Sequence, residues 1–257
     1  MDYMAGAATD SGDAEMSGTA SSAPQRTWVL FVVFAVVYAF FISAPAVFHQ
    51  EFPLRRDIEW GDVLDIATPF LVFALAWTLI RASVGGVSSG LGFAFLMLAV
   101  AWTQGQGMHL ASNSIGHQVP ENASGDLPEV IHFYDEQLSH YIWYLGVGLL
   151  PLLFLVVLWR GQPSSDAGNA LPVVVAGVIY GVSLGLSSLE AAVVPMTFSL
   201  FVATLVFAVF LHRSVPPLRR VQLFTFCFTA VAVAIVVLIG WGIYYGGWPE
   251  LSDVGLI

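Results

Sequence analysis

The chain has 257 residues, of which 57% are hydrophobic and only 10% are charged, and its formal net charge is −10 at pH 7. So large an apolar share excludes an ordinary soluble domain and indicates an integral membrane protein. The acidic balance argues against a nucleic-acid partner, because nucleic-acid-binding surfaces are basic. All eight basic side chains are arginine, and a lysine-free, acidic composition fits a halophilic protein from a high-salt organism.

The chain divides into a polar tail and an apolar remainder. Residues 1–25 are rich in Gly, Ala, Ser and acidic residues, so we expect a disordered acidic tail there. The segment 26–257 contains seven stretches of about 20 apolar residues, the length that crosses a bilayer. We therefore predict an all-α fold, a polytopic membrane bundle of seven transmembrane helices. The expected spans are 27–48, 63–82, 90–117, 130–159, 170–191, 195–213 and 220–245.

The arginines predict how this bundle is oriented in the cell membrane. Arginine is enriched in the cytoplasmic loops of membrane proteins. A cytoplasmic N-terminus and an outside C-terminus put six arginines inside and two outside, so we expect this orientation, with the acidic tail in the cytoplasm. The inside set is Arg26, Arg81, Arg160, Arg213, Arg219 and Arg220, and the outside pair is Arg55 and Arg56.

Two ladders of polar residues stand near the predicted outer ends of the third and fourth spans. Residues at i, i+4 and i+8 share one face of a helix. Ionisable side chains within a membrane span are costly, and they mark functional sites by default. The ladders consist of His109, Asn113 and His117 in one span and His132, Glu136 and His140 in the next.

Counting along the helices places several ionisable residues at one depth. With a rise of about 1.5 Å per residue, Asp65, His109, His140 and Glu190 each lie about 24–30 Å from the predicted inner boundary of their span. Four separate spans therefore contribute to one shallow layer beneath the outer surface. The alternative is that Asp65 and Glu190 only cap helix ends near water.

These residue types suggest a metal centre. Histidine with histidine or carboxylate at i+4 presents two metal ligands from one helix, which suits Zn²⁺, with Fe as the second choice. Such a metal lowers the pKa of its bound water to about 7 and so supplies hydroxide. Asp135 or Glu136 would be the general base, and Ser112 or Asn113 would stabilise an oxyanion. The candidate metal ligands are His109, His117, His132, Glu136 and His140.

Seven spans with Ser, His and Asp near one membrane face resemble the superfamily of alkaline ceramidases and progestin/adipoQ receptors. That resemblance implies a Zn site of three histidines with a nearby Asp and Ser, for which Ser112, His109 or His117, and Asp135 are the matching positions. The chain departs from the family in its last span, which carries aromatic residues such as Trp241 where the family has a histidine pair.

The sequence thus favours a metal-dependent hydrolase that acts on lipid or another amphiphile at the outer face. The alternatives are a haem-binding redox protein, a transporter with a proton relay, and a non-enzymatic membrane subunit. A relay needs titratable groups in both halves of the membrane, and the inner half has almost none.

Two further motifs are interpreted as structural. The segment Gly86–Gly90 matches G-x-S-x-G, but it lacks the strand-to-helix turn of a nucleophile elbow, so we expect Ser88 or Ser89 to cap a helix. The small residues Gly177, Gly181 and Gly185 predict a face of close helix packing.

Overall fold

The computed structural model describes residues 27–120, 123–161, 169–215, 218 and 221–257. The tail predicted at 1–25 lies outside these residues. The described chain is helical apart from one two-stranded antiparallel hairpin, β1 (Glu51–Phe52) and β2 (Arg55–Glu59). The helices are α1 (Trp28–Ser43), α2 (Trp60–Ser83), α3 (Ser89–Gly116), α4 (Asp126–His132), the π-helix η1 (Phe133–Leu138), α5 (Ser139–Arg160), α6 (Ala170–Glu190), α7 (Val194–Ser214) and α8 (Gln222–Tyr245).

Five of the helical runs are long and apolar enough to cross a membrane, as judged by length and composition. They are α2, the continuous run α4–η1–α5, α6, α7 and α8. This confirms an all-α bundle of the kind found in membrane-embedded proteins. The helix α1 is apolar but has only 16 residues, and the second half of α3 carries polar side chains that lower its hydropathy. The count of seven spans therefore stays a prediction.

The helix ends follow from local chemistry. The helix α2 begins at Trp60, three residues before the predicted start, because Glu59 and Asp62 form a capping box in which the Glu59 N–H donates to Asp62 Oδ2 at 2.9 Å. The start of α3 confirms the predicted cap, since Leu91 N–H donates to Ser88 Oγ at 3.4 Å.

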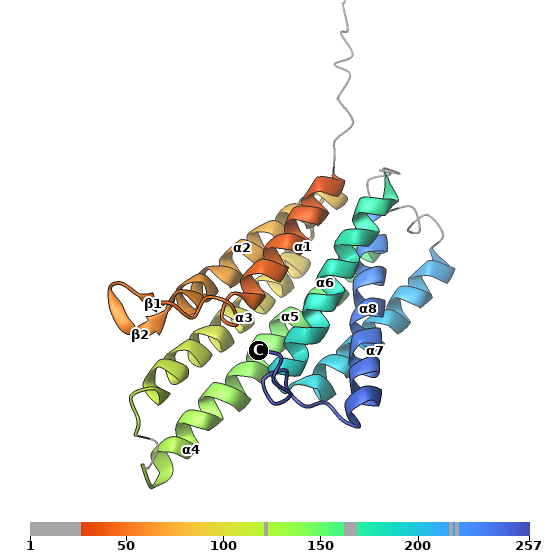
Figure 1. Cartoon of the computed structure of the whole chain (residues 1–257). Helices are drawn as coiled ribbons and strands as arrows, with labels where there is room; N and C mark the ends of the chain where they lie inside the picture. The colour runs from red at the N-terminus through yellow and green to blue at the C-terminus, as the bar shows by residue number, and fades with distance from the viewer. Residues whose placement is uncertain (1–26, 121–122, 162–168, 216–217, 219–220) are drawn as a thin grey trace, which may run out of the picture.

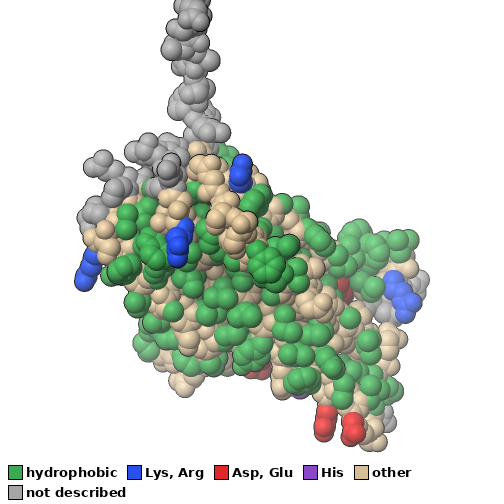
Figure 2. Space-filling model, turned by 180° about the vertical axis from the view of Figure 1, so that it is seen from behind, with side chains coloured by type: hydrophobic (Ala, Val, Ile, Leu, Met, Phe, Trp, Pro, Cys, Tyr) green, Lys and Arg blue, Asp and Glu red, His purple; other side chains and the backbone are tan. Residues whose placement is uncertain are grey.

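Successive helices run up and down, so each end of the bundle collects particular residues (Figure 1). Arg81, Arg160 and Arg213 lie in the last turns of α2, α5 and α7, and we call this the arginine end. The opposite, histidine end carries the ends of α3 and α6 and the starts of α2 and α5. Figure 2 shows a broad apolar face between basic side chains at one end and acidic side chains at the other, with a further basic group to one side.

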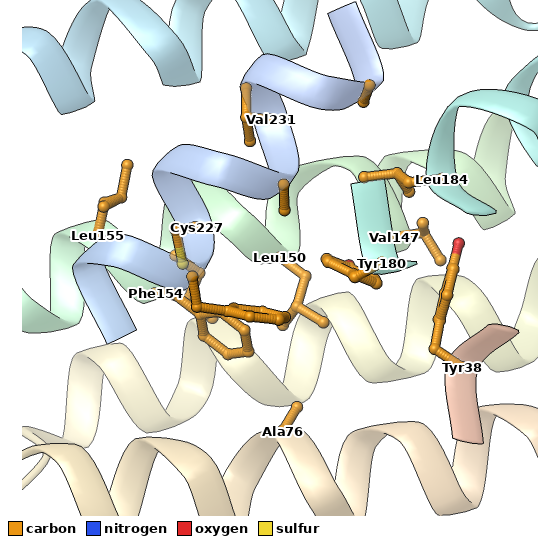
Figure 3. Close-up of a cluster of buried hydrophobic side chains, with 14 of the residues drawn as sticks. Tyr38, Ala76, Val147, Leu150, Phe154, Leu155, Tyr180, Leu184, Cys227 and Val231 are labelled. Atoms are coloured by element: carbon orange, nitrogen blue, oxygen red, sulfur yellow. The ribbon is translucent and has the colours of Figure 1, made fainter. Parts of the chain in front are cut away.

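The core lies among α1, α2, α5, α6 and α8 (Figure 3). Tyr180 of α6 stacks on Phe226 of α8 with ring centroids 5.5 Å apart, and Tyr38 of α1 meets Tyr180 edge-on at 4.7 Å. The single cysteine, Cys227, is buried in this cluster and free. Aromatic pairs in these geometries add to the apolar packing that holds the helices together.

Glycines set the closest helix contacts. The predicted face on α6 is confirmed, because a Cβ on Gly177 would lie 2.9 Å from Thr229 Cβ and one on Gly181 would lie 3.0 Å from Ala230 Cα. The pair α3 and α5 is just as close. A Cβ on Gly105 would lie 2.6 Å from Ser139 O, and one on Gly146 would lie 2.6 Å from Leu98 O. Only glycine permits backbones to approach this nearly.

We expect Gly105→Ala to lower the free energy of unfolding by about 1–3 kcal/mol, the usual cost of overpacking a tight contact. The measurement is the thermal unfolding midpoint in detergent. Gly107→Ala is the matched control, because a Cβ there meets nothing within 4 Å and alanine favours the helix. Equal midpoints for the two variants would contradict a glycine-dependent contact between α3 and α5.

Candidate functional site

A cavity of about 400 Å³ opens at the histidine end of the bundle. Five of the predicted site residues line it, and they come from α2, α3, η1, α5 and α6. The rest of the wall comes from aromatic residues of α5, from the chain after α1 and from the segment after α8. The lining includes Asp65, His109, Glu136, His140, Trp143, Tyr144, Ser187, Glu190 and Glu250.

His109 forms an ion-pair contact with Asp135 across the α3–η1 interface. Its Nδ1 lies 2.8 Å from Asp135 Oδ1 and 3.4 Å from Asp135 O. Both partners are acceptors, so Nδ1 carries the hydrogen and the other ring nitrogen, Nε2, is left for a ligand or a proton. The side chains of His109 and Asp135 are only 23% and 14% exposed, so the contact is shielded from bulk water.

His140 is fixed in the same way by a backbone group. Its Nδ1 lies 3.1 Å from Ala191 O, and a carbonyl oxygen can only accept, so Nδ1 again carries the hydrogen. The two imidazole rings lie 4.9 Å apart between centroids. Two histidines, each with Nδ1 anchored, therefore face one cavity from neighbouring helices.

The π-helix corrects the predicted ladder on the fourth span. A π turn bonds i to i+5, so residues five apart come to share a face. Asp135 and His140 are five apart, and both lie next to His109. Glu136 still reaches His140, with Oε2 3.7 Å from Nδ1, but His132 is exposed and does not line the cavity. The i+4 spacing thus holds for Glu136 and His140, whereas His132 lies outside the lining and the π turn η1 brings Asp135 beside His109.

Asp65 is positioned by a proline. Pro69 has no N–H and therefore leaves the carbonyl of Asp65, four residues earlier, without its helical partner. Gln106 of α3 supplies the missing donor, since its Nε2 lies 2.7 Å from Asp65 O. The Asp65 carboxylate accepts from Thr68 Oγ1 at 3.3 Å, and the residue is 1% exposed. This hydrogen bond ties α2 to α3 beside His109.

Glu190 holds the C-terminal segment 249–257 against the cavity. Its Oε2 accepts the backbone N–H groups of Leu251 at 2.9 Å and Ser252 at 3.2 Å. Trp241 Nε1 also donates to Pro249 O at 3.0 Å. Figure 1 shows this segment leaving α8 and turning back across the histidine end of the bundle. The predicted secondary site residue Glu190 therefore binds the segment that covers the cavity.

Glu250, on that segment, lies among other negatively charged side chains around the cavity. Its partial burial, followed by the carboxylates of Glu190, Asp253 and Glu136, raises the pKa of the Glu250 carboxyl above its usual range. The nearby carboxylates thus disfavour the anionic form of Glu250, and a bound cation would neutralise their charge.

The other predicted residues lie elsewhere. Ser112 is buried, Asn113 is partly exposed and His117 is exposed at the end of α3, and none of them lines the cavity. Their predicted roles as oxyanion donors or ligands have no support from this placement.

Sequence reasoning missed several residues of the wall, namely Tyr144, Ser187 and the segment 249–257. Tyr144 Oη donates to Ser187 O at 2.6 Å, which joins α5 to α6 beside the cavity. The spacing of Tyr144 from His140, one turn along α5, was the available signal. No sequence pattern predicts that the segment 249–257 folds back onto Glu190.

The anchored histidines fit a metal ligand pair, because metal-binding histidines commonly donate their other ring N–H to a carboxylate or carbonyl. Among the described residues, however, no group of three or more His, Cys, Asp or Glu stands close enough together to hold a metal ion. A third donor would require a side-chain rotation, for which the lining offers the carboxylates of Asp65 and Glu136.

We expect Glu190→Ala to release the segment 249–257. Hydrogen bonds to a charged acceptor contribute about 1.5–3 kcal/mol, so amide exchange of this segment should accelerate roughly 10–100-fold by mass spectrometry. Glu129→Ala, an exposed acid on α4, is the control. Unchanged exchange in Glu190→Ala would show that other contacts hold the segment.

No protein-family model, curated protein or solved structure matches this chain. The resemblance to alkaline ceramidases and progestin/adipoQ receptors accordingly stays a prediction that depends on the residues quoted for it.

Proposed function

We propose that this chain is a seven-span membrane hydrolase that cleaves an amphiphile, such as a membrane lipid, at the outer face of the cell membrane. The observation that carries the proposal is the pair His109 and His140, each with Nδ1 anchored, facing one cavity at the end of an apolar bundle. The arginine bias supports a cytoplasmic N-terminus and an outside C-terminus, which puts the cavity on the outer side.

The His109–Asp135 contact supplies the base. His109 Nε2 takes a proton from water as the water oxygen bonds to the electrophilic carbon of the substrate. Asp135 stabilises the resulting imidazolium and holds its orientation. The same proton then passes from Nε2 to the leaving group as the scissile bond breaks, so His109 returns to its starting state.

We further propose that the site binds a Zn²⁺ ion, with Fe²⁺ as the second choice. Nε2 of His109 and His140 would hold the metal, in which case His109 is a ligand and not the base, and the metal would supply a water that is deprotonated near neutral pH. Haem fits this pair less well. In a bis-histidine haem the two rings stand on opposite faces of the macrocycle, whereas these rings are tilted against each other with centroids 4.9 Å apart.

We expect His109→Ala and His140→Ala to lose bound metal while the bundle still folds. Metal content is measured by mass spectrometry of protein purified without chelator, and folding by circular dichroism. His117→Ala and His132→Ala are the controls, because both residues lie outside the cavity lining and should keep the metal. Sub-stoichiometric metal in the wild type would remove the metal from the proposal, and a Soret absorbance band would favour the haem alternative.

We expect Asp135→Asn to lower hydrolysis by about 10²–10⁴-fold, the usual contribution of general acid–base catalysis. The assay is product release from a panel of ester, amide and phosphoester amphiphiles in nanodiscs. Glu129→Gln should retain full activity. If the wild type cleaves none of these linkages, the hydrolase proposal is wrong and the non-enzymatic membrane subunit becomes the better account.

A further inference from the structure

A second hollow, with a volume of about 330 Å³, opens at the arginine end of the bundle, between the C-terminal end of α7 and the first two turns of α8. Its lining combines a guanidinium group, an imidazole, two phenyl rings and two hydroxyl groups. These side chains belong to His212, Arg213, Phe224, Thr225, Phe228 and Thr229. None of them lines the cavity at the histidine end, so this hollow is a separate site.

Three rings of this lining form a stacked column. The imidazole of His212 lies 6.0 Å from the ring of Phe224, with an angle of 21° between their planes. Phe224 in turn stacks on Phe228, with centroids 6.1 Å apart and planes at 20°. The column leads from the arginine end into the apolar span, and Phe228 is 37% exposed. Aromatic faces in a row offer a hydrocarbon chain continuous van der Waals contact, so this wall fits a lipid chain.

The charge around this hollow favours an anion, although the chain as a whole is acidic. Every acidic side chain that the structure describes belongs to the histidine end, on the hairpin, α4, η1, the start of α2, the end of α6 or the segment after α8. Arg213 makes no hydrogen bond, ion pair or ring contact with any described residue, whereas Arg160 at the same end lies over the ring of Trp159 at 4.8 Å. Within the described chain, the Arg213 guanidinium thus keeps its N–H donors for an oxyanion such as a phosphate.

Thr229 supplies a second observation, which is independent of charge. The other threonine hydroxyls within the described helices, Thr225 among them, each donate to a backbone carbonyl about one turn earlier. Thr229 Oγ1 makes no hydrogen bond with any described residue, although the side chain lines the hollow within an apolar span. A hydroxyl without an acceptor is unfavourable at membrane depth, where water is scarce. An oxygen atom of a ligand in the hollow would accept this hydrogen bond.

We propose that the hollow binds one anionic phospholipid from the leaflet at the arginine end. Arg213 binds the phosphate, Thr229 Oγ1 donates to an ester or ether oxygen of the glycerol backbone, and one chain lies along Phe224 and Phe228. Basic pockets between transmembrane helices bind phospholipid head groups in this way, and the cytoplasmic leaflet is the one rich in anionic lipid. The arginine bias predicts that this end is cytoplasmic. The lipid site lies at the opposite end from the proposed hydrolase cavity, so neither requires the other.

The test is native mass spectrometry of the full chain in non-ionic detergent. The chain is titrated with dioleoylphosphatidylglycerol or with the chain-matched zwitterion dioleoylphosphatidylcholine, and we expect the anionic lipid to bind about fivefold more tightly. Arg213→Gln should weaken binding of the anionic lipid roughly fivefold, the contribution of one basic residue beside an anionic lipid. Arg81→Gln is the matched control and should leave binding unchanged, because Arg81 is an exposed arginine at the same end that does not line the hollow.

A second variant, Val209→Trp, tests the hollow itself while keeping its charge. Val209 lines the hollow and is 36% exposed, so an indole there should fill the volume and abolish the preference for the anionic lipid. Val206→Trp is the matched control, at an exposed position of α7 outside the lining, and it should bind lipid like the wild type.

Equal binding of the two lipids, or equal affinities of Arg213→Gln and Arg81→Gln for the anionic lipid, would overturn the inference in favour of a diffuse basic surface. An unchanged preference in Val209→Trp would also contradict it. A last arm adds sodium phosphate, compared with sodium chloride of the same ionic strength. If phosphate alone displaces the lipid, the hollow is a site for a free oxyanion and the lipid assignment fails, whereas lipid binding that survives phosphate supports it.

Discussion

The close approach of α3 and α5 is the constraint on which the histidine end depends. Gly105 and Gly146 face the partner helix where a Cβ would lie 2.6 Å from a backbone oxygen, so the two backbones meet without intervening side chains. His109 follows Gly105 by one turn, and this places its ring 4.9 Å from that of His140. Any larger residue at these glycines would push the helices apart and separate the imidazoles. The packing of small residues thus determines the chemistry one turn away.

The polar groups at the histidine end are held by specific partners. Pro69 leaves the Asp65 carbonyl without a helical hydrogen-bond partner, and the side-chain amide of Gln106 donates to this carbonyl instead. The π turn η1 turns Asp135 toward His109, while the Ala191 carbonyl at the end of α6 fixes His140. These partners matter because an unsatisfied buried polar group costs more than its hydrogen bond gains. The buried side-chain atoms of the described chain that have no such partner do not cluster in one place, since they include the Trp143 indole N–H at the cavity, the Trp102 indole N–H in the core and the Gln222 amide at the start of α8.

The segment 249–257 gives the cavity part of its wall and part of its charge. Its attachment to Glu190 makes the acidic cluster a composite of three helical elements, α2, η1 and α6, and the segment after α8. The segment therefore contributes both backbone and charge to the wall that the histidines share.

The sequence by itself determined that the chain is a bundle of apolar helices, the approximate bounds of these helices, and the common level of Asp65, His109, His140 and Glu190 along the bundle, because apolar runs and a fixed rise per residue are local properties. It also predicted the Ser88 cap and the glycine face of α6. Only the tertiary structure decided which polar residues meet. Three facts depend on neighbouring helices and are absent from any residue spacing: the π turn that excludes His132, the anchoring of each Nδ1, and the return of 249–257 to Glu190. His117 and Asn113 share the helical face of His109, yet they lie beyond the reach of the partners that build the cavity.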